Sequence, residues 1–326
     1  MKNTKTLAAL TALALTVSLT ACSAGKTAAT TPAPTETQPQ SGHYPVTITN
    51  YNYAGEPVTY TYEKAPEKVI TVYQGCIETM IALGLEDHVL ASYGLDNEVK
   101  DEWKDGFARM HYDESVFAPD KETVTLLEPD MIFSWGSYFG EKKLGDVGAW
   151  NEKGVGTYMN SNTVPGGTRT LENEYTDILN IGKIFDVEDK AQALVDEMKG
   201  QVEATLAAAQ GQDPVRVAVV EPTAGGTMTN YGDDSLAGDM VTALGGELAR
   251  PDGSDLGKED LVACDPDVIF VVYMAYAGDD PALASLSAVQ NGRVHLIMLG
   301  DMYASGPRTI DGIRTLAQGM YPGLDL

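Results

Sequence analysis

The sequence predicts an α/β protein of two similar lobes joined by a long rigid helix, with a ligand cleft between the lobes. Three observations predict this class. Short β-branched runs alternate with helical segments in both halves of the chain, which is typical of βαβ units and mainly parallel sheets. An amphipathic stretch lies between the halves. A motif in the first half recurs in the second, which indicates an internal duplication.

The first 22 residues are typical of a bacterial lipoprotein signal peptide. Two lysines precede an apolar stretch over 7–19, which is too short to span a bilayer. Residues Leu19 to Cys22 (LTAC) then place small side chains before a cysteine. This run resembles the bacterial lipobox, whose cysteine is lipidated and becomes the mature N-terminus. Residues 23–43 are rich in Thr, Ala and Pro, which predicts a flexible tether.

The N-terminal lobe is expected over residues 44–168. It begins with a hairpin, because residues 44–62 alternate apolar and polar side chains around a turn at 54–57. Strands and helices then alternate. The strands are expected at 68–73, 88–93, 131–135 and 155–159, and the helices at 76–83 and 122–127.

Residues 169–211 are expected to form a helical linker. Apolar side chains from Val187 to Leu206 recur at steps of three and four, which predicts an amphipathic helix of about six turns. Asp186 is a plausible N-cap for this helix, and Gly211 stops it. A long helix in this position favours a rigid connection over a flexible hinge.

The α/β pattern restarts over residues 212–326 and predicts a C-terminal lobe of the same kind. The strands are expected at 216–221, 267–273 and 294–299, and the helices at 236–244, 259–264 and 309–320. Both lobes are therefore predicted to be Rossmann-like.

The repeated motif contains a pair of equivalent glutamates. Residues 122–133 (ETVTLLEPDMIF) match residues 259–270 (EDLVACDPDVIF) at an offset of 137. Glu122 and Glu259 each fall in the first turn of a short helix, where an acid complements the helix dipole. The duplication also places one carboxylate at an equivalent surface point of each lobe, suited to two basic residues of a symmetric partner. The residues alone leave both interpretations open.

Composition and motifs exclude several functions. The chain has 22 Lys and Arg against 47 Asp and Glu, a formal charge of −25, so nucleic acid is an unsuitable partner. The sequence carries no nucleophile elbow, no H-E-x-x-H and no P-loop, so an enzyme is not expected. With four His, and only His111 in an expected cleft loop, no resident metal is expected. Cys76 and Cys264 are expected to be buried thiols without a disulfide.

The layout and three phrases resemble a known family. The phrases are KVITVYQGCIETMIALGLEDHVLASYG, ETVTLLEPDMIFSW and KEDLVACDPDVIFVVY. Over about residues 64–322 the chain resembles the helical-backbone class (class III) of ABC-importer substrate-binding proteins, which carry ferric siderophores, haem and cobalamin. The resemblance implies that Glu122 and Glu259 dock onto arginines of two permease subunits. The chain departs from the family at Tyr73-Gln74-Gly75-Cys76, where many members have a Ser-Pro stretch.

The ligand is expected at loops that follow the carboxyl ends of the strands. Aromatic rings there supply stiff contact area, and arginine suits carboxylates or the anionic oxygens of a ferric chelate. Any one tyrosine is equally well explained by packing. An alternative role for Arg308 is to brace the last helix. An alternative role for Arg169 is to pair with Glu172 or Glu174. The candidates are Tyr73, Gln74, Trp135, Ser137, Tyr138, Asn162, Arg169, Asn230, Tyr231, Tyr273, Tyr276, Met302, Tyr303 and Arg308.

We therefore expect a lipid-anchored binding protein on the extracytoplasmic face of the cell membrane. It is expected to be a monomer without a cofactor, to capture a ferric siderophore, and to deliver it to an ABC permease dimer with its ATPase. Cobalamin, another corrinoid or haem is the alternative ligand, because haem takes an axial Tyr, His or Met and cobalamin suits the same aromatic walls.

Overall fold

The computed structural model describes residues 42–326, apart from residue 224 and residues 274–286. Cys22, most of the predicted tether and Tyr276 lie outside the described residues. By internal contacts the chain divides into residues 1–40 and residues 41–326, and the fold described below is that of the second unit. No helix in its described part is long and apolar enough to cross a bilayer.

The first sheet of the N-terminal lobe is wholly parallel. Its strands lie in the order β4-β3-β5-β6. They span β3 (Val69–Val72), β4 (Val89–Tyr93), β5 (Met131–Ser134) and β6 (Gly156–Met159). Every residue of β3, β5 and β6 is buried, which is why these strands are continuous apolar runs rather than alternating ones.

The predicted hairpin is confirmed as β1 (Val46–Tyr51) and β2 (Pro57–Tyr62), which pair antiparallel. In its turn Gly55 has φ +77°, a conformation that favours glycine. The hairpin joins the main sheet through Asn50, whose side chain donates to the Met159 carbonyl and accepts from the Met159 amide at 3.0 and 2.7 Å. The helices of this lobe are α1 (Gln74–Ala82), α2 (Lys104–Phe107), α3 (Lys121–Leu127) and α4 (Val147–Asn151).

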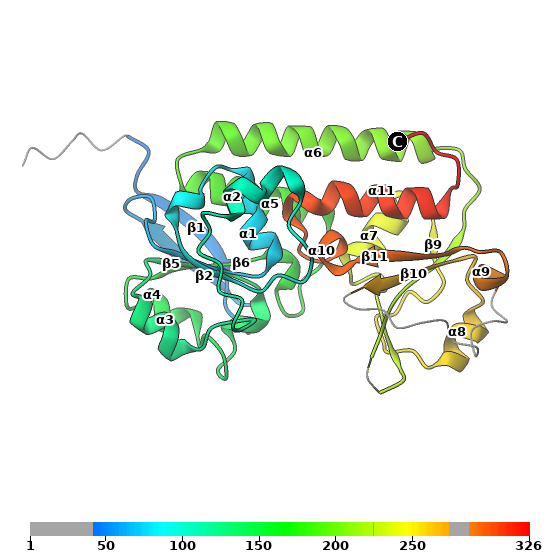
Figure 1. Cartoon of the computed structure of the whole chain (residues 1–326), viewed down its shortest axis with the longest axis horizontal. Coiled ribbons are helices and arrows are strands. Elements are labelled where there is room, and N and C mark those ends of the chain that lie inside the picture. The colour runs from blue at the N-terminus through cyan, green and yellow to red at the C-terminus, as the bar shows by residue number, and fades with distance from the viewer. Residues whose placement is uncertain (1–41, 224, 274–286) are drawn as a thin grey trace, which may run out of the picture. The chain divides into compact units, whose positions relative to one another are not determined.

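Two helices, not one, occupy the linker. They are α5 (Leu171–Ile184) and α6 (Glu188–Ala209). The prediction of Asp186 as N-cap is wrong, because Asp186 has φ +56° and the N-cap is Val187, without a side-chain cap. Helix α6 contacts both α5 and α11 (Figure 1). Its first half contributes Val195 and Met198 to the N-terminal core, and its second half contributes Val202 to the C-terminal core.

The C-terminal lobe has a mixed sheet in the order β11-β10-β7-β8, with β9 also paired to β7. Strand β8 runs antiparallel to β7 and was not predicted, whereas β10 is parallel to both β7 and β11. The strands are β7 (Arg216–Pro222), β8 (Met228–Asn230), β9 (Glu247–Leu248), β10 (Val268–Tyr273) and β11 (Val294–Met298). The helices are α7 (Leu236–Ala243), α8 (Lys258–Cys264), α9 (Ser287–Gln290), α10 (Leu299–Met302) and α11 (Thr309–Met320).

The repeated motif folds in the same way in both lobes. The residues that end α3 and α8, Glu128 and Asp265, both adopt the left-handed conformation. The aspartate two residues later then binds the backbone at the start of a central strand, which is β3 in the N-terminal lobe and β7 in the C-terminal lobe. Asp130 accepts from the Lys68 amide and Asp267 from the Arg216 amide, each at 2.8 Å. The duplication seen in the sequence is therefore a duplication of structure.

Both cysteines in the described residues are free. Cys76 is fully buried, and its thiol donates to the side-chain oxygen Oδ1 of Asn160 at 2.9 Å. Burial raises the pKa of this thiol well above its usual value. Cys264 is only half-buried, so the prediction of a buried thiol is wrong there.

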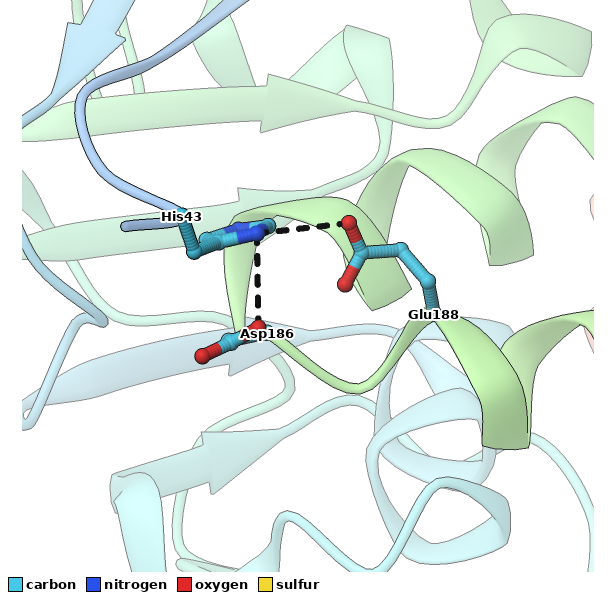
Figure 2. A group of neighbouring side chains, drawn as sticks. All are labelled: His43, Asp186 and Glu188. Carbon is cyan, nitrogen blue, oxygen red and sulfur yellow. Dashed lines mark ion pairs between the residues drawn. The ribbon is translucent and has the colours of Figure 1, made fainter. Parts of the chain in front are cut away.

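The start of the described chain is fixed to the junction between α5 and α6. His43 lies with Nε2 2.8 Å from the Lys183 carbonyl and Nδ1 3.3 and 3.4 Å from carboxylate oxygens of Asp186 and Glu188 (Figure 2). These three side chains are close enough together to hold a cation. The His43 ring contacts both acids directly, and these contacts account for the group without a bound ion.

Candidate ligand-binding site

Five predicted ligand residues form one aromatic cluster, which draws on both lobes. Tyr73, Trp135 and Tyr138 come from the N-terminal lobe, and Tyr231 and Tyr303 from the C-terminal lobe. The Tyr73 and Trp135 rings are stacked with centroids 3.6 Å apart, and Trp135 meets Tyr303 edge-on at 4.9 Å. Tyr138 lies 6.5 Å from Trp135, and Tyr231 lies 6.4 Å from Tyr303. The contact between Trp135 and Tyr303 therefore joins the lobes.

The parallel sheet explains how the N-terminal members meet. Tyr73 directly follows β3 and Trp135 directly follows β5, and these strands pair with Val72 opposite Ser134. The next residue of each strand therefore emerges at the same sheet edge, where open α/β sheets bind ligands. Tyr303 follows α10, and Tyr231 follows β8. The buried Nε1 of Trp135 has no hydrogen-bond partner among the described residues.

The backbone at Tyr73 is strained. Its φ is +96°, a region that residues other than glycine rarely adopt and that costs about 1–3 kcal/mol. The Tyr73 amide donates to the Tyr93 carbonyl at 2.8 Å, and the side chain is fully buried. Burial, followed by the neighbouring Asp96 carboxylate, raises the pKa of Tyr73 well above its usual value. Strained residues of this kind persist only where the surrounding structure holds them in place. They are found most often at active sites and ligand-binding sites.

Two carboxylates accompany the aromatic cluster, and sequence analysis missed both. The Tyr231 hydroxyl donates to a Glu221 oxygen at 2.6 Å. Asp96 lies beside Tyr73, and its backbone amide donates to Gln74 at 3.2 Å. Burial, and then the Glu221 carboxylate, raise the pKa of Asp96. Neither acid belongs to a motif, so only their spatial proximity to the tyrosines identifies them.

Arg169 reaches the cluster as predicted, but its partners differ from the expected ones. Its guanidinium lies 5.4 Å above the Tyr303 ring. Nε donates to the Asn162 carbonyl at 2.9 Å, and one terminal nitrogen donates to the Asp234 carbonyl at 2.8 Å. Pairing with Glu172 or Glu174 is not seen, and Glu172 pairs with Lys199 instead.

Arg308 is not available to a ligand, so its prediction as a ligand contact is wrong. The side chain is buried and donates through Nε to Glu78 on α1 at 2.6 Å. It also lies 3.4 Å from Asp301 and donates to the Glu98 carbonyl. Arg308 therefore links the lobes through an ion pair, which agrees with the alternative bracing role.

A second polar contact links the lobes beside the first. The Glu174 carboxylate on α5 accepts hydrogen bonds from the amides of Ser305 and Gly306 at 3.2 and 2.6 Å. Asn162 donates to the same carboxylate at 2.5 Å. Burial, with a further contribution from Asp177, raises the pKa of Glu174 to about 7. Residues 305–308 are therefore bonded to two buried acids outside the C-terminal lobe, Glu78 on α1 and Glu174 on the linker helix α5.

Four other predicted ligand residues have structural roles instead, because their polar atoms or surfaces are already occupied. Gln74 bonds to Glu78 and to the amides of residues 96 and 97. Asn162 bonds to Thr170, Asn173 and Glu174, and Asn230 to the carbonyls of Arg250 and Asp252. Met302 is fully buried in the C-terminal core.

The remaining candidates lie as follows. Ser137 is exposed next to Tyr138. Tyr273 is the last residue of β10. The side chain of Tyr273 and the whole of Tyr276 lie outside the described part of the chain. His111 is exposed.

Glu122 and Glu259 occupy equivalent exposed positions in the first turns of α3 and α8. Within the described ranges neither glutamate forms an ion pair. One turn after Glu122, Leu126 is 84% exposed, and Val262 follows Glu259 with 41% exposure. Each helix therefore presents an acid and an apolar side chain to solvent, which is a suitable surface for a partner protein.

Comparison with known proteins identifies the family. A family model described as periplasmic binding protein matches residues 69–298. The chain belongs to this family. It is 24% identical to YvrC, an ABC transporter substrate-binding lipoprotein of Bacillus subtilis, over 80% of this chain and 82% of that protein. It is 26% identical to the petrobactin-binding protein YclQ of Bacillus subtilis, over 74% and 78% of the two chains.

A solved periplasmic binding protein from Veillonella parvula has the same fold. It superposes with a TM-score of 0.76 at 29% identity, and the match covers 86% of this chain and 92% of that one. The prediction of an α/β fold in the helical-backbone class is confirmed. The chain is thus an ABC-importer substrate-binding protein and not an enzyme.

Proposed function

We propose that this protein captures a ferric siderophore outside the membrane and delivers it to an ABC permease. The aromatic cluster carries the proposal, because it gathers stiff rings from both lobes around the strand ends where the fold binds ligands. The petrobactin-binding relative supports an iron chelate as the ligand. Capture is a binding equilibrium in which the rings of both lobes contact one chelate.

The lobes are expected to move modestly when the ligand enters. The rings of the aromatic cluster touch one another directly, so a bulky chelate must separate Trp135 from Tyr303. Helix α6 contributes to both cores, and this shared packing resists a wide hinge motion.

The position in the cell follows from the same proposal. Cys22 is proposed as the lipidated residue that anchors the protein on the extracytoplasmic face, as the lipobox resemblance implies. A lipoprotein relative supports this anchoring. Radiolabelled palmitate incorporated into the wild type but not into Cys22→Ser would support the anchor, and equal labelling would contradict it.

Ligand titration tests the function. The purified chain is titrated with a ferric hydroxamate, a ferric catecholate, haemin and cyanocobalamin while Trp and Tyr fluorescence is recorded. We expect saturable sub-micromolar quenching by a ferric chelate. Quenching by haemin or cyanocobalamin alone would replace the substrate, and no quenching by any compound would contradict capture of this ligand class.

Removing the two exposed glutamates is expected to block transport and leave capture intact. In Glu122→Ala/Glu259→Ala, uptake of the chelate by cells should fall at least tenfold, because two charge-assisted contacts to permease arginines are lost. The affinity of the purified protein for the chelate should change less than twofold.

The matched control is Glu114→Ala/Glu247→Ala, which also removes one exposed glutamate from each lobe. This control should transport normally. If the two double variants transport equally well, Glu122 and Glu259 do not dock the permease.

A further inference from the structure

Two carboxylates, one from each lobe, lie at the aromatic cluster. Glu221 accepts a hydrogen bond from the Tyr231 hydroxyl at 2.6 Å, and the Asp96 amide donates at 3.2 Å to Gln74, the residue after Tyr73. Both carboxyl side chains belong to half-buried residues. Within the described ranges, neither Asp96 nor Glu221 forms an ion pair with a Lys, Arg or His.

The cations that touch the aromatic cluster offset these acids only in part. Arg169 lies over Tyr303 and donates to main-chain carbonyls, so its single positive charge is retained against two carboxylates. Lys143 lies 4.4 Å above the Tyr138 ring on an exposed side chain, where solvent and salt screen its charge. Arg308, the remaining predicted cation, is neutralised by Glu78 and Asp301.

Two like charges from opposite lobes have an electrostatic consequence for any ligand placed between the lobes. Like charges repel, and the pKa of Asp96 is raised mainly by burial and to a smaller extent by the Glu221 carboxylate. A cationic ligand relieves this repulsion, a neutral ligand leaves it unchanged, and a polyanionic ligand adds to it. Rejection by like charge is an effective source of specificity because it penalises the wrong ligand.

We propose that Asp96 and Glu221 select iron chelates of neutral or positive net charge, such as ferric trihydroxamates, and reject polyanionic ferric tris(catecholates). This inference rests on the proposed function and names the substrate class of the same site. Glu221 also has a local role, because it holds the Tyr231 hydroxyl. Charge selection predicts an effect whose sign depends on the ligand, which a purely local role does not.

The experiment measures three chelates against isosteric variants. The chelates are a cationic ferric trihydroxamate with one free amine, a neutral cyclic ferric trihydroxamate and a trianionic ferric tris(catecholate). The wild type should bind the cationic chelate at least tenfold more tightly than the trianionic one. In Asp96→Asn/Glu221→Gln that preference should shrink by about tenfold or more, with the neutral chelate changing less than twofold. The preference of the wild type should also weaken as salt rises.

Glu114→Gln/Glu247→Gln is the charge-matched control for the chelate experiment. It removes one exposed acid from each lobe and should leave all three affinities unchanged. An equal loss for all three chelates in Asp96→Asn/Glu221→Gln would show a structural role only and would overturn the inference. Tighter wild-type binding of the trianionic chelate would overturn charge selection while leaving iron-chelate capture intact. No binding of any chelate would refute the proposed function and the inference with it.

Discussion

Replacing Arg308 by methionine is expected to lower the free energy of unfolding by about 3–5 kcal/mol. The guanidinium is the cation paired with Glu78, whose side chain is fully buried, and with Asp301. Methionine keeps the apolar volume but leaves both acids without their counter-charge. Urea unfolding at neutral pH, followed by far-UV circular dichroism, measures the difference.

Two companion variants separate the ion pair from general packing. Arg308→Met/Glu78→Gln should recover part of the lost stability, because it also removes the buried negative charge. Arg250→Met, which breaks an exposed pair with Asp252, should cost less than about 1 kcal/mol. A loss below about 1 kcal/mol for Arg308→Met would show that the inter-lobe ion pair is not important for stability.

Replacing Trp135 by alanine is expected to weaken chelate binding by about 30- to 150-fold, equivalent to about 2–3 kcal/mol. Trp135 contacts Tyr73 and Tyr138 in its own lobe and Tyr303 in the other. It is therefore the ring that joins the two halves of the aromatic cluster, and we expect a bound chelate to pack against it. Trp135→Phe should recover most of the affinity, because phenylalanine restores a flat apolar face.

The measurement needs a ligand signal that survives the substitution. Equilibrium dialysis with radioactive iron avoids fluorescence, and circular dichroism checks that the variant is folded. Trp103→Phe is the control, since Trp103 contacts Lys100 and Arg308 rather than the aromatic cluster. Unchanged affinity in Trp135→Ala would place the ligand away from the aromatic cluster.

Local patterns sufficed to predict most elements. The hairpin, the buried parallel strands and the helices α3, α8 and α11 lie where periodicity and turn residues predicted them. Helix α1 begins at Gln74 rather than at residue 76, the N-cap of α6 is Val187 rather than Asp186, and β8 was not predicted. The junction at Asp186 depends on a left-handed residue, and no apolar period reveals such a residue.

The candidate site was only partly predictable. The rule that ligands lie at strand ends selected five rings that the structure brings together in the aromatic cluster. The same rule included Asn162, Met302 and Arg308, because a sequence does not show which side chain has a buried partner. It missed Asp96 and Glu221, since an acid in a loop or at a strand end resembles any surface acid until its neighbours are known.

The sequence by itself determined the α/β class, the duplication and the equivalent placement of Glu122 and Glu259, because these depend on residue periodicity and on repeats along the chain. The tertiary structure decided which of the candidate residues meet. Arg308 pairs with Glu78, 230 residues away along the chain, and Trp135 contacts Tyr303 of the other lobe. Such contacts depend on long-range packing and burial, which set the pairing and the electrostatic surroundings of each group and leave no trace in local sequence.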